Sequence, residues 1–363
     1  MHAVLSRRAL GRATLARQLL LERSGLGVVQ AVEGVVGLQA QVPAVPYLAL
    51  WNRVTSFTTD DLATAMVDRS VVRMTLFRGT IHTVSAADAR ALRPWVQPML
   101  ERVFATTAWG KALKGHDIRP AMRSAAQITG AIPLTRADLS PLLAERFPDF
   151  DGSDLAWAFS YLHPVVQPTP RGVWGKAGKS ALTPVEAWLA DVPAAPTATA
   201  QQILRRFFDA FGPASVADAS TWSGLSKLRE VVETMDLRRF RTEEGAELFD
   251  VPDGALPDPD TPAPVRFTPE YENALLAYAD RSRVMADGEH EMLVGGPGGH
   301  IGSVLVDGLV RATWAVTGRD ETSRLTIRQS GKLNRRERRE VETEGRRLLG
   351  FLRPGVDPVI TFL

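Results

Sequence analysis

Residues 71–84 read VVRMTLFRGTIHTV, and this stretch decides the fold. It is rich in β-branched and aromatic residues and has Gly79 near its middle, which is typical of a β-hairpin. The residues before it indicate helices, because apolar side chains recur there at helical spacing. They are Leu15, Leu19 and Leu20, then Val28, Val32, Val35 and Val36, and then residues 47–54, with Pro43 and Pro46 interrupting the pattern. Helices followed by a β-hairpin have the order of a winged helix.

The same order recurs twice along the chain. Residues 58–61, TTDD, predict a helix start before the first hairpin, and Thr135 predicts another within residues 130–147. A helix over 155–162 and two short strands with a turn over 165–178, VVQPTPRGVWGKAG, complete the second unit. The third unit has predicted helices at 199–211, 215–220 and 226–235, followed by a strand-like segment at 237–251. These repeats are loose in sequence, so they indicate a pattern of three units.

Proline-rich stretches at 193–197 and 252–264 mark boundaries. We expect winged-helix units at residues 1–115, 116–196 and 197–262, and a C-terminal region at 263–363. The elements predicted in this last region are a helix at 274–284, a strand, Gly-rich loop, strand, Asp-Gly turn and strand over 291–316, a strand at 322–330 and a charged helix at 332–352. The expected fold class is mixed α+β and mainly helical, with a C-terminal β-sheet or barrel that carries a hairpin.

Composition excludes several kinds of site. The chain of 363 residues has no cysteine, so disulfides, thiolate nucleophiles and cysteine metal sites are excluded. The six histidines have no paired-ligand spacing, and we predict no metal and no cofactor. The N-terminus lacks a signal-peptide pattern and no apolar run is long enough to cross a bilayer, so we expect a cytoplasmic protein without membrane contact. The net charge of +2 is weak evidence for a nucleic-acid partner, and the excess of arginine over lysine fits either phosphate binding or codon bias.

Two glutamines stand close together in GLQAQVP, residues 37–43. On a helix Gln39 and Gln41 would point to different faces, whereas in an extended segment they would point to the same side. Pro43 disfavours helical backbone at Val42, which favours the extended alternative. The other interpretation is an ordinary polar helix C-terminus, and the pattern alone favours it.

Residues 32–54, VEGVVGLQAQVPAVPYLALWNRV, closely resemble the Gln-apolar-Gln motif of the AlkZ-like DNA glycosylases, in the AlkZ/YcaQ superfamily of tandem winged-helix proteins. Further stretches that resemble this family are residues 77–88, 205–225, 278–284 and 304–314, so the resemblance extends over nearly the whole chain. YcaQ-like members typically have Asp at the second glutamine, so Gln41 indicates the AlkZ-like branch. The resemblance implies three winged helices in a C-shaped arrangement around double-stranded DNA that carries alkylated guanine.

The same resemblance implies base excision. Members of this branch include self-resistance enzymes of antibiotic producers that remove bulky N7-alkylguanine adducts, and some unhook interstrand crosslinks. Alkylation at N7 makes the base cationic and weakens the glycosidic bond, so the enzyme needs mainly to position a water. By resemblance, Gln39 and Gln41 carry this catalytic role. Because no lysine lies near the motif, we expect a monofunctional glycosylase. We also expect it to be a monomer.

The resemblance also implies DNA contacts. The Gly-rich stretch 294–303 matches a family hairpin that reaches the DNA groove, and it places Gly298, Gly299 and His300 there, although a flexible loop is the plainer interpretation. Arg78 and His82 lie in the first predicted wing; a lone histidine is usually structural, but the resemblance favours a DNA-facing position.

Two other groups of arginines each have two interpretations. Arg281 and Arg283 fit phosphate contacts or surface ion pairs equally well. The RRERR run at 335–339 fits a solvated helix face better than a DNA-contact patch.

Two other classes of function remain open from the sequence. A winged-helix transcriptional regulator would bind a specific undamaged sequence, usually as a dimer. No heptad seam for dimerisation is present, and the helix expected after Thr221 is not conspicuously suited to reading bases. A drug-binding protein that sequesters a toxin is the third alternative, and it would bind free drug without DNA.

Overall fold

The computed structural model describes residues 3–193, 196–286, 302–318 and 323–363. Its first part contains β1 (Ala3–Leu5), α1 (Arg7–Arg17), α2 (Val28–Gly34), β2 (Leu38–Gln39), α3 (Val45–Arg53), α4 (Thr59–Val67), β3 (Val71–Thr75), the short 3₁₀ turn η1 (Phe77–Gly79) and β4 (Ile81–Ser85). Strands β3 and β4 pair antiparallel from Val71 opposite Ser85 to Thr75 opposite Ile81. The hairpin predicted from residues 71–84 is therefore confirmed, and helices precede it as expected.

The start of α4 follows from a capping box. Thr58 has extended backbone, and Asp61 accepts a hydrogen bond from the Thr58 backbone N–H at 2.7 Å. This arrangement satisfies N–H groups that have no partner within the helix. The helix start predicted at residues 58–61 is confirmed.

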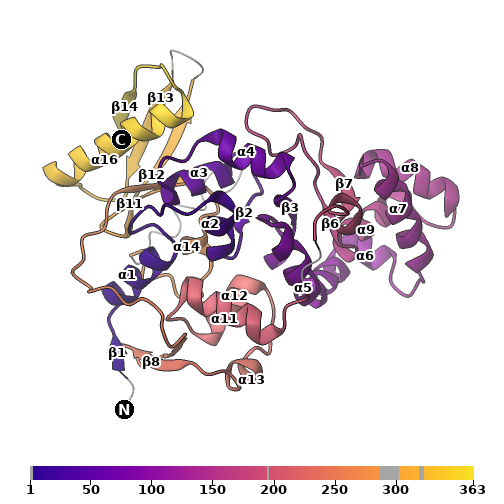
Figure 1. The fold of residues 1–363 in the computed structure, drawn as a ribbon, viewed down its shortest axis with the longest axis horizontal. Helices are drawn as coiled ribbons and strands as arrows, with labels where there is room; N and C mark the ends of the chain where they lie inside the picture. Colours follow the sequence, from indigo (N-terminus) through magenta and orange to yellow (C-terminus); the bar gives the residue numbers. More distant parts are fainter. Residues whose placement is uncertain (1–2, 194–195, 287–301, 319–322) are drawn as a thin grey trace.

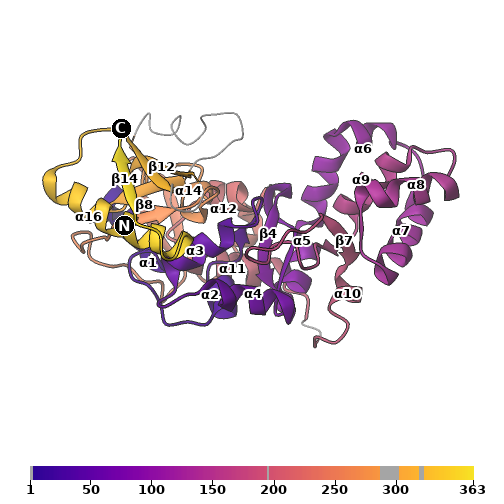
Figure 2. The ribbon, with the colours of Figure 1, turned by 90° about the horizontal axis from the view of Figure 1, so that it is seen from above.

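The second part forms a helical lobe at one side of the molecule (Figures 1 and 2). Its elements are the C-terminal end of α5 (Ala86–Thr106), then α6 (Ala108–Ala112), α7 (Arg119–Ala131), β5 (Leu134–Thr135), α8 (Arg136–Arg146), α9 (Gly152–Leu162), β6 (Val165–Val166) and β7 (Ala181–Pro184). The lobe has its own apolar core, which includes Phe104, Leu143 and Phe159. Thr135 caps α8 by accepting from the Asp138 N–H at 3.1 Å, as predicted.

The strand pair of this lobe differs from the prediction. Only Val165–Val166 of the stretch 165–178 is a strand, and its partner β7 lies beyond that stretch, with Val166 opposite Thr183. Pro168 and Pro170 cannot donate to a strand ladder, which explains why the intervening segment stays irregular. The two short strands predicted within 165–178 were therefore partly wrong.

One sheet connects the first two parts. Six strands follow the order β2-β4-β3-β6-β7-β5, and Met74 of β3 pairs with Val166 of β6. The hairpin next to the two glutamines is thus joined directly to the strands of the lobe. This connection fixes the glutamine segment relative to the helices α8 and α9.

The third part packs against the first. It contains α10 (Val185–Trp188), α11 (Ala200–Phe211), α12 (Val216–Ser223), α13 (Arg229–Val232), β8 (Arg238–Thr242) and β9 (Glu247–Asp250). Phe207 and Phe211 of α11 and Trp222 of α12 are buried in the same core as Phe77 and Val84 of the first hairpin. The predicted strands at 237–251 are confirmed as a hairpin, and β1 pairs with β8 in parallel. The helix predicted at 226–235 is shorter, because Lys227 has left-handed backbone with φ 60°.

The described residues of the C-terminal part form a five-stranded sheet, ordered β10-β11-β12-β13-β14. Its elements are β10 (Arg266–Thr268), α14 (Asn273–Leu276), β11 (Gly302–Val306), β12 (Leu309–Thr317), β13 (Arg324–Gln329), α16 (Arg335–Leu352) and β14 (Val359–Phe362). Asp307 and Gly308, both with positive φ, form the predicted Asp-Gly turn between β11 and β12. The expected charged helix is α16, and it connects the parallel neighbours β13 and β14.

The helix expected at 274–284 ends early. α14 stops at Leu276, and Asp280 instead accepts hydrogen bonds from the backbone N–H and the hydroxyl of Ser282. An aspartate that bonds the backbone two residues ahead offers the chain a turn in place of a helix. Among the described residues, no helix is both long and apolar enough to span a membrane.

Candidate active site

The glutamine segment begins just after α2 ends, where the chain reverses direction. The Gly37 N–H donates to the Val32 carbonyl at 2.8 Å, and the Val36 N–H donates to the Glu33 carbonyl at 3.1 Å. These two bonds form a Schellman motif in which Val36 (φ 55°) and Gly37 (φ 88°) are left-handed. A Cβ at Gly37 would lie 2.8 Å from Val84 Cγ1, so glycine is needed there. A β-branched residue such as Val36 is strained in this conformation. The reversal sends the following residues into β2, so Gln39 is extended rather than helical.

Gln39 is buried at the edge of the hairpin. It pairs with His82 of β4, and the residue is 5% exposed. Its Oε1 accepts a hydrogen bond from Arg78 Nη2 at 2.8 Å. Because a guanidinium only donates, the amide oxygen must face Arg78, which fixes the orientation of the amide. A second lone pair of Oε1 and the amide NH₂ group remain available for other partners.

Arg78 connects the first and third parts of the chain. It lies in the hairpin turn with left-handed backbone (φ 56°), and its Nη1 donates to the Trp222 carbonyl of α12 at 2.6 Å. Burial and the nearby charge of Arg281 lower the pKa of Arg78 to about 10. The guanidinium therefore stays protonated at neutral pH while it is held between Gln39 and the third part of the chain.

His82 is an interior residue in this structure. It is 2% exposed, and its Nδ1 donates to the Thr80 carbonyl at 3.0 Å, because that carbonyl can only accept. Its ring meets Phe77 edge to face, with 5.3 Å between the ring centroids. Burial and the charge of Arg78 lower the pKa of His82 to about 3. The imidazole is thus neutral at pH 7, and its predicted contact with DNA stays a prediction.

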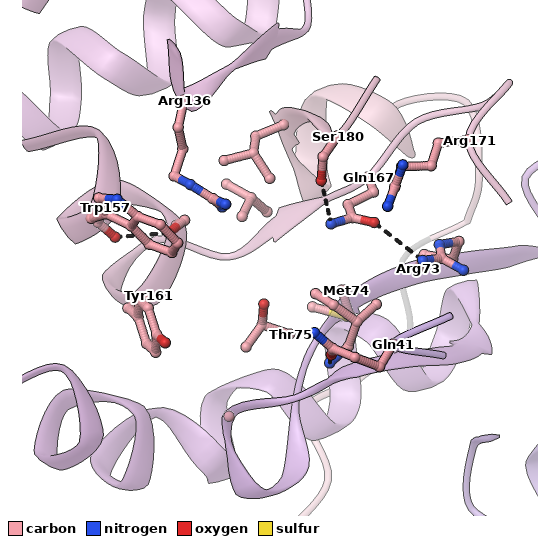
Figure 3. A pocket seen from close by; sticks show the side chains of 15 residues that line it. Gln41, Arg73, Met74, Thr75, Arg136, Trp157, Tyr161, Gln167, Arg171 and Ser180 are labelled. Atoms are coloured by element: carbon pink, nitrogen blue, oxygen red, sulfur yellow. Dashed lines mark hydrogen bonds between the residues drawn. The ribbon is translucent and has the colours of Figure 1, made fainter. Parts of the chain in front are cut away.

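Gln41 lies on the wall of a cavity of about 430 Å³ (Figure 3). The side chain is exposed, and its Oε1 accepts from the Ile81 N–H at 3.4 Å, a long hydrogen bond. Across the cavity lie Arg136 of α8 and Trp157 and Tyr161 of α9. Both glutamines therefore contact the first hairpin, and Gln41 faces the lobe.

The other predicted contact residues lie in different surroundings. Arg281 is half-buried and close enough to Arg78 to lower its pKa. Arg283 is 5% exposed; it donates to the Pro213 carbonyl at 2.9 Å and lies over the Tyr278 ring at 4.1 Å. Its contact with DNA stays a prediction, since the structure gives it internal partners. Gly298, Gly299 and His300 lie outside the described residues.

Several supporting residues come from distant parts of the chain. Asn273 Nδ2 donates to the Gly37 carbonyl at 2.7 Å, and Arg206 Nη2 donates to the Glu33 carbonyl at 3.0 Å. No sequence pattern predicted a role for Asn273, Arg206 or Trp222. Arg206 and Trp222 do lie in the stretch 205–225 that resembles the family, which was the available signal.

The site offers neutral amides and guanidinium groups. Among the described residues, no aspartate or glutamate lines the cavity, and no group of three or more histidine, aspartate or glutamate side chains is arranged to hold a metal ion. Amides can orient a water by accepting and donating hydrogen bonds, and guanidinium groups suit phosphate oxygens. This arrangement suits the positioning of water next to an anionic polymer.

Comparisons with known proteins agree with this chemistry. A family model described as DNA glycosylase AlkZ-like matches residues 32–351, and a search of curated proteins finds no match. The solved structure of the Streptomyces sahachiroi DNA glycosylase AlkZ has a similar fold, with a TM-score of 0.81 at 20% sequence identity. The match covers 99% of this chain and 100% of that one. The chain thus belongs to the AlkZ-like DNA glycosylase family, as its sequence predicted.

Proposed function

We propose that this protein is a monofunctional DNA glycosylase that hydrolyses the N-glycosidic bond of N7-alkylguanine, with Gln39 and Gln41 as its catalytic residues. The observation that carries the proposal is the hydrogen bond from Arg78 to Gln39 Oε1, which orients a motif glutamine in a chain of this family. Gln41 follows two residues later, contacts the same hairpin through the Ile81 N–H and borders an open cavity. A buried amide held in one orientation suits a group that positions rather than transfers protons.

The chemistry of the substrate explains why neutral residues suffice. An N7-alkylated guanine carries a positive charge and leaves without a strong general acid, through a transition state that resembles an oxocarbenium ion. The glutamines would hold a water at the C1′ face of the sugar, one oxygen accepting its hydrogen bond. His82 is neutral at pH 7 and buried, so it would support the hairpin rather than supply a proton.

The way DNA is held follows from the same proposal. Each predicted unit, at 1–115, 116–196 and 197–262, contains helices followed by a strand pair, which supports a tandem winged-helix arrangement that curves around the duplex. A bulky adduct resists full rotation into a snug pocket, so an open site suits it better. Arg281 and the 298–300 segment would approach the DNA beside the lesion. The preferred adducts are bulky natural products, which would make the protein a self-resistance enzyme.

Base release from defined duplexes tests the proposal. Two duplexes carry N7-methylguanine or a bulky N7-guanine adduct, and an unmodified duplex of the same sequence is the control. We expect the free modified base to appear under single-turnover conditions, with no strand cleavage until the abasic site is treated with alkali. No release from any N7 adduct, together with a sequence-specific footprint on undamaged DNA, would identify a transcriptional regulator instead.

A further inference from the structure

Three arginines line the cavity beside Gln41 (Figure 3). Arg73 comes from β3, Arg136 from the first turn of α8, and Arg171 from the segment between β6 and β7. Within the described part of the chain, none of the three has a carboxylate within ion-pair distance, and the cavity lining contains no acidic residue. The cavity is therefore a concentration of positive charge that receives no counter-charge from the described residues.

Arg73 shows the most direct sign of a missing partner. It is 2% exposed, and its Nη2 donates to the Ala40 carbonyl at 2.9 Å and to Gln167 Oε1 at 3.4 Å, whereas its Nε and Nη1 have no hydrogen-bond partner among the described residues. Arg171 also has a buried Nε without a partner. Burial and the charge of Arg171 lower the pKa of Arg73 to about 10, so the guanidinium still carries its charge at neutral pH.

Two arginines of this chain with buried side chains are neutralised by carboxylates. Arg53 forms an ion pair with Glu272, and Arg17 forms one with Asp250. A buried guanidinium that lacks a counter-ion and leaves some of its N–H groups without acceptors is costly, so these arginines indicate a partner that binds from outside the chain. The bidentate fork of an arginine fits phosphate oxygens particularly well.

We propose that this cavity binds a phosphate group through Arg73, Arg171 and Arg136. In the complex with DNA the ligand is a backbone phosphodiester of the damaged strand close to the lesion, an assignment that rests on the proposed function because Gln41 borders the same cavity. Arg136 lies over the Trp157 ring at 3.6 Å, which holds its guanidinium at the wall opposite Gln41. The phosphate contact would set the distance between the sugar of the lesion and the glutamines.

The salt dependence of DNA binding tests this site without any catalysis. The probe is a duplex with a stable abasic-site analogue, and the variants are Arg73→Met and Arg171→Met. Each lost phosphate contact is expected to weaken binding and to reduce the slope of log affinity against log salt by roughly one. Unchanged slopes in both folded variants would overturn the proposal. Thermal unfolding checks each variant, and Arg171→Met, at a partly exposed residue, carries the test if Arg73→Met does not fold.

Arg93→Met is the matched control. Arg93 is also 2% exposed, but its guanidinium donates to Gln97 and to the carbonyls of Tyr161 and His163, and it does not line the cavity. This variant is expected to lose stability while its salt slope stays that of the wild type. If the salt slope of Arg93→Met is reduced as well, the loss of any buried arginine alters DNA binding. That result would overturn the assignment of the phosphate site to this cavity.

Neutral methylphosphonate linkages, placed one at a time around the abasic analogue, identify the source of the phosphate. At one linkage near the lesion, the methylphosphonate is expected to weaken DNA binding by the wild type. The same linkage should not weaken binding by Arg73→Met any further, because that variant has already lost the phosphate contact.

A second outcome would be that inorganic phosphate raises the melting temperature of the wild type but not of Arg73→Met, while every methylphosphonate linkage weakens the DNA binding of both proteins equally. The ligand is then a free phosphate, and the DNA assignment is overturned. If the wild type releases the base but the salt slopes of the variants are unchanged, only the phosphate site is overturned. If the salt slopes of the variants are reduced but the wild type releases no base, only the glycosylase activity is overturned.

Discussion

The guanidinium of Arg78 donates to Gln39 Oε1 at 2.8 Å and to the carbonyl of Trp222 at 2.6 Å. One side chain in the turn of the first hairpin therefore joins the glutamine motif to a helix that lies more than a hundred residues further along the chain. We expect Arg78 to position Gln39 rather than to contact the reacting atoms. Loss of Arg78 should therefore slow base release while DNA binding is retained.

Arg78→Met is expected to reduce base release by roughly 10²-fold, because the amide of Gln39 loses the donor that orients it. The loss should appear in the single-turnover rate constant at saturating enzyme, since the variant retains the three arginines that line the cavity. Single-turnover release from a duplex with N7-methylguanine measures it. Arg102→Met is the control, because Arg102 donates to the Gly224 carbonyl at 2.6 Å and has no contact with either glutamine. Equal rates for Arg78→Met and the wild type would contradict the positioning role.

Gly37→Ala is expected to destabilise the protein by more than about 1 kcal/mol. Gly37 has φ 88°, and an added Cβ would lie 2.8 Å from Val84 Cγ1. Gly34→Ala is the matched change three residues earlier, at the last residue of α2, where a Cβ has no neighbour within 4 Å. It should be neutral or stabilise the protein by up to about 1 kcal/mol. Urea unfolding compares the two, and a loss of stability of the same size in both would refute this account of the turn.

Arg53→Met is expected to destabilise the fold by about 3–5 kcal/mol, because it leaves the Glu272 carboxylate buried without its partner. Both side chains of this ion pair are fully buried, and a second hydrogen bond joins Arg53 Nη1 to Glu272 Oε2 at 3.1 Å. The double variant Arg53→Met/Glu272→Gln should recover a large part of the loss. Denaturant unfolding of the single and double variants measures the coupling, and additive losses would argue against a paired charge.

The pH dependence of the free energy of unfolding should reflect the titration of His82. Its pKa falls from 6.5 to about 3 on folding, because of burial and the charge of Arg78. Between these two values the unfolded chain binds a proton that the folded protein does not, so stability is full above pH 6.5 and decreases as the pH falls toward 3. His82→Phe should show a shallower decrease over this range. Urea midpoints from pH 7 to pH 4 test it, and parallel curves would mean that His82 titrates normally in the folded state.

Local sequence signals predicted many of the elements. Thr58 and Thr135 cap helices where their side chains suggested, and the β-branched run at 71–84 is a hairpin. These features depend on interactions within a few residues, which a sequence displays directly. Strand β14 was not foreseen, because its stability depends on pairing with β13 across the intervening helix α16.

The candidate site could be predicted only in part. Gln39 and Gln41 were identified through their resemblance to a family, since two glutamines in an extended segment carry no strong physical signal alone. The contact between Arg78 and Trp222 and the unpaired charge of Arg73 arise from residues that tertiary packing brings together. Neither follows from periodicity or spacing, because those patterns describe one element at a time.

The most direct test of the central claim is base release by Gln39→Ala, Gln41→Ala and the double variant, measured beside their affinity for the abasic-site duplex. We predict that the double variant releases no N7-alkylguanine above background while it binds the duplex as tightly as the wild type. That result would locate the chemistry at the glutamine segment. Release at the rate of the wild type by the folded double variant would contradict the claim and place the reaction elsewhere in the protein.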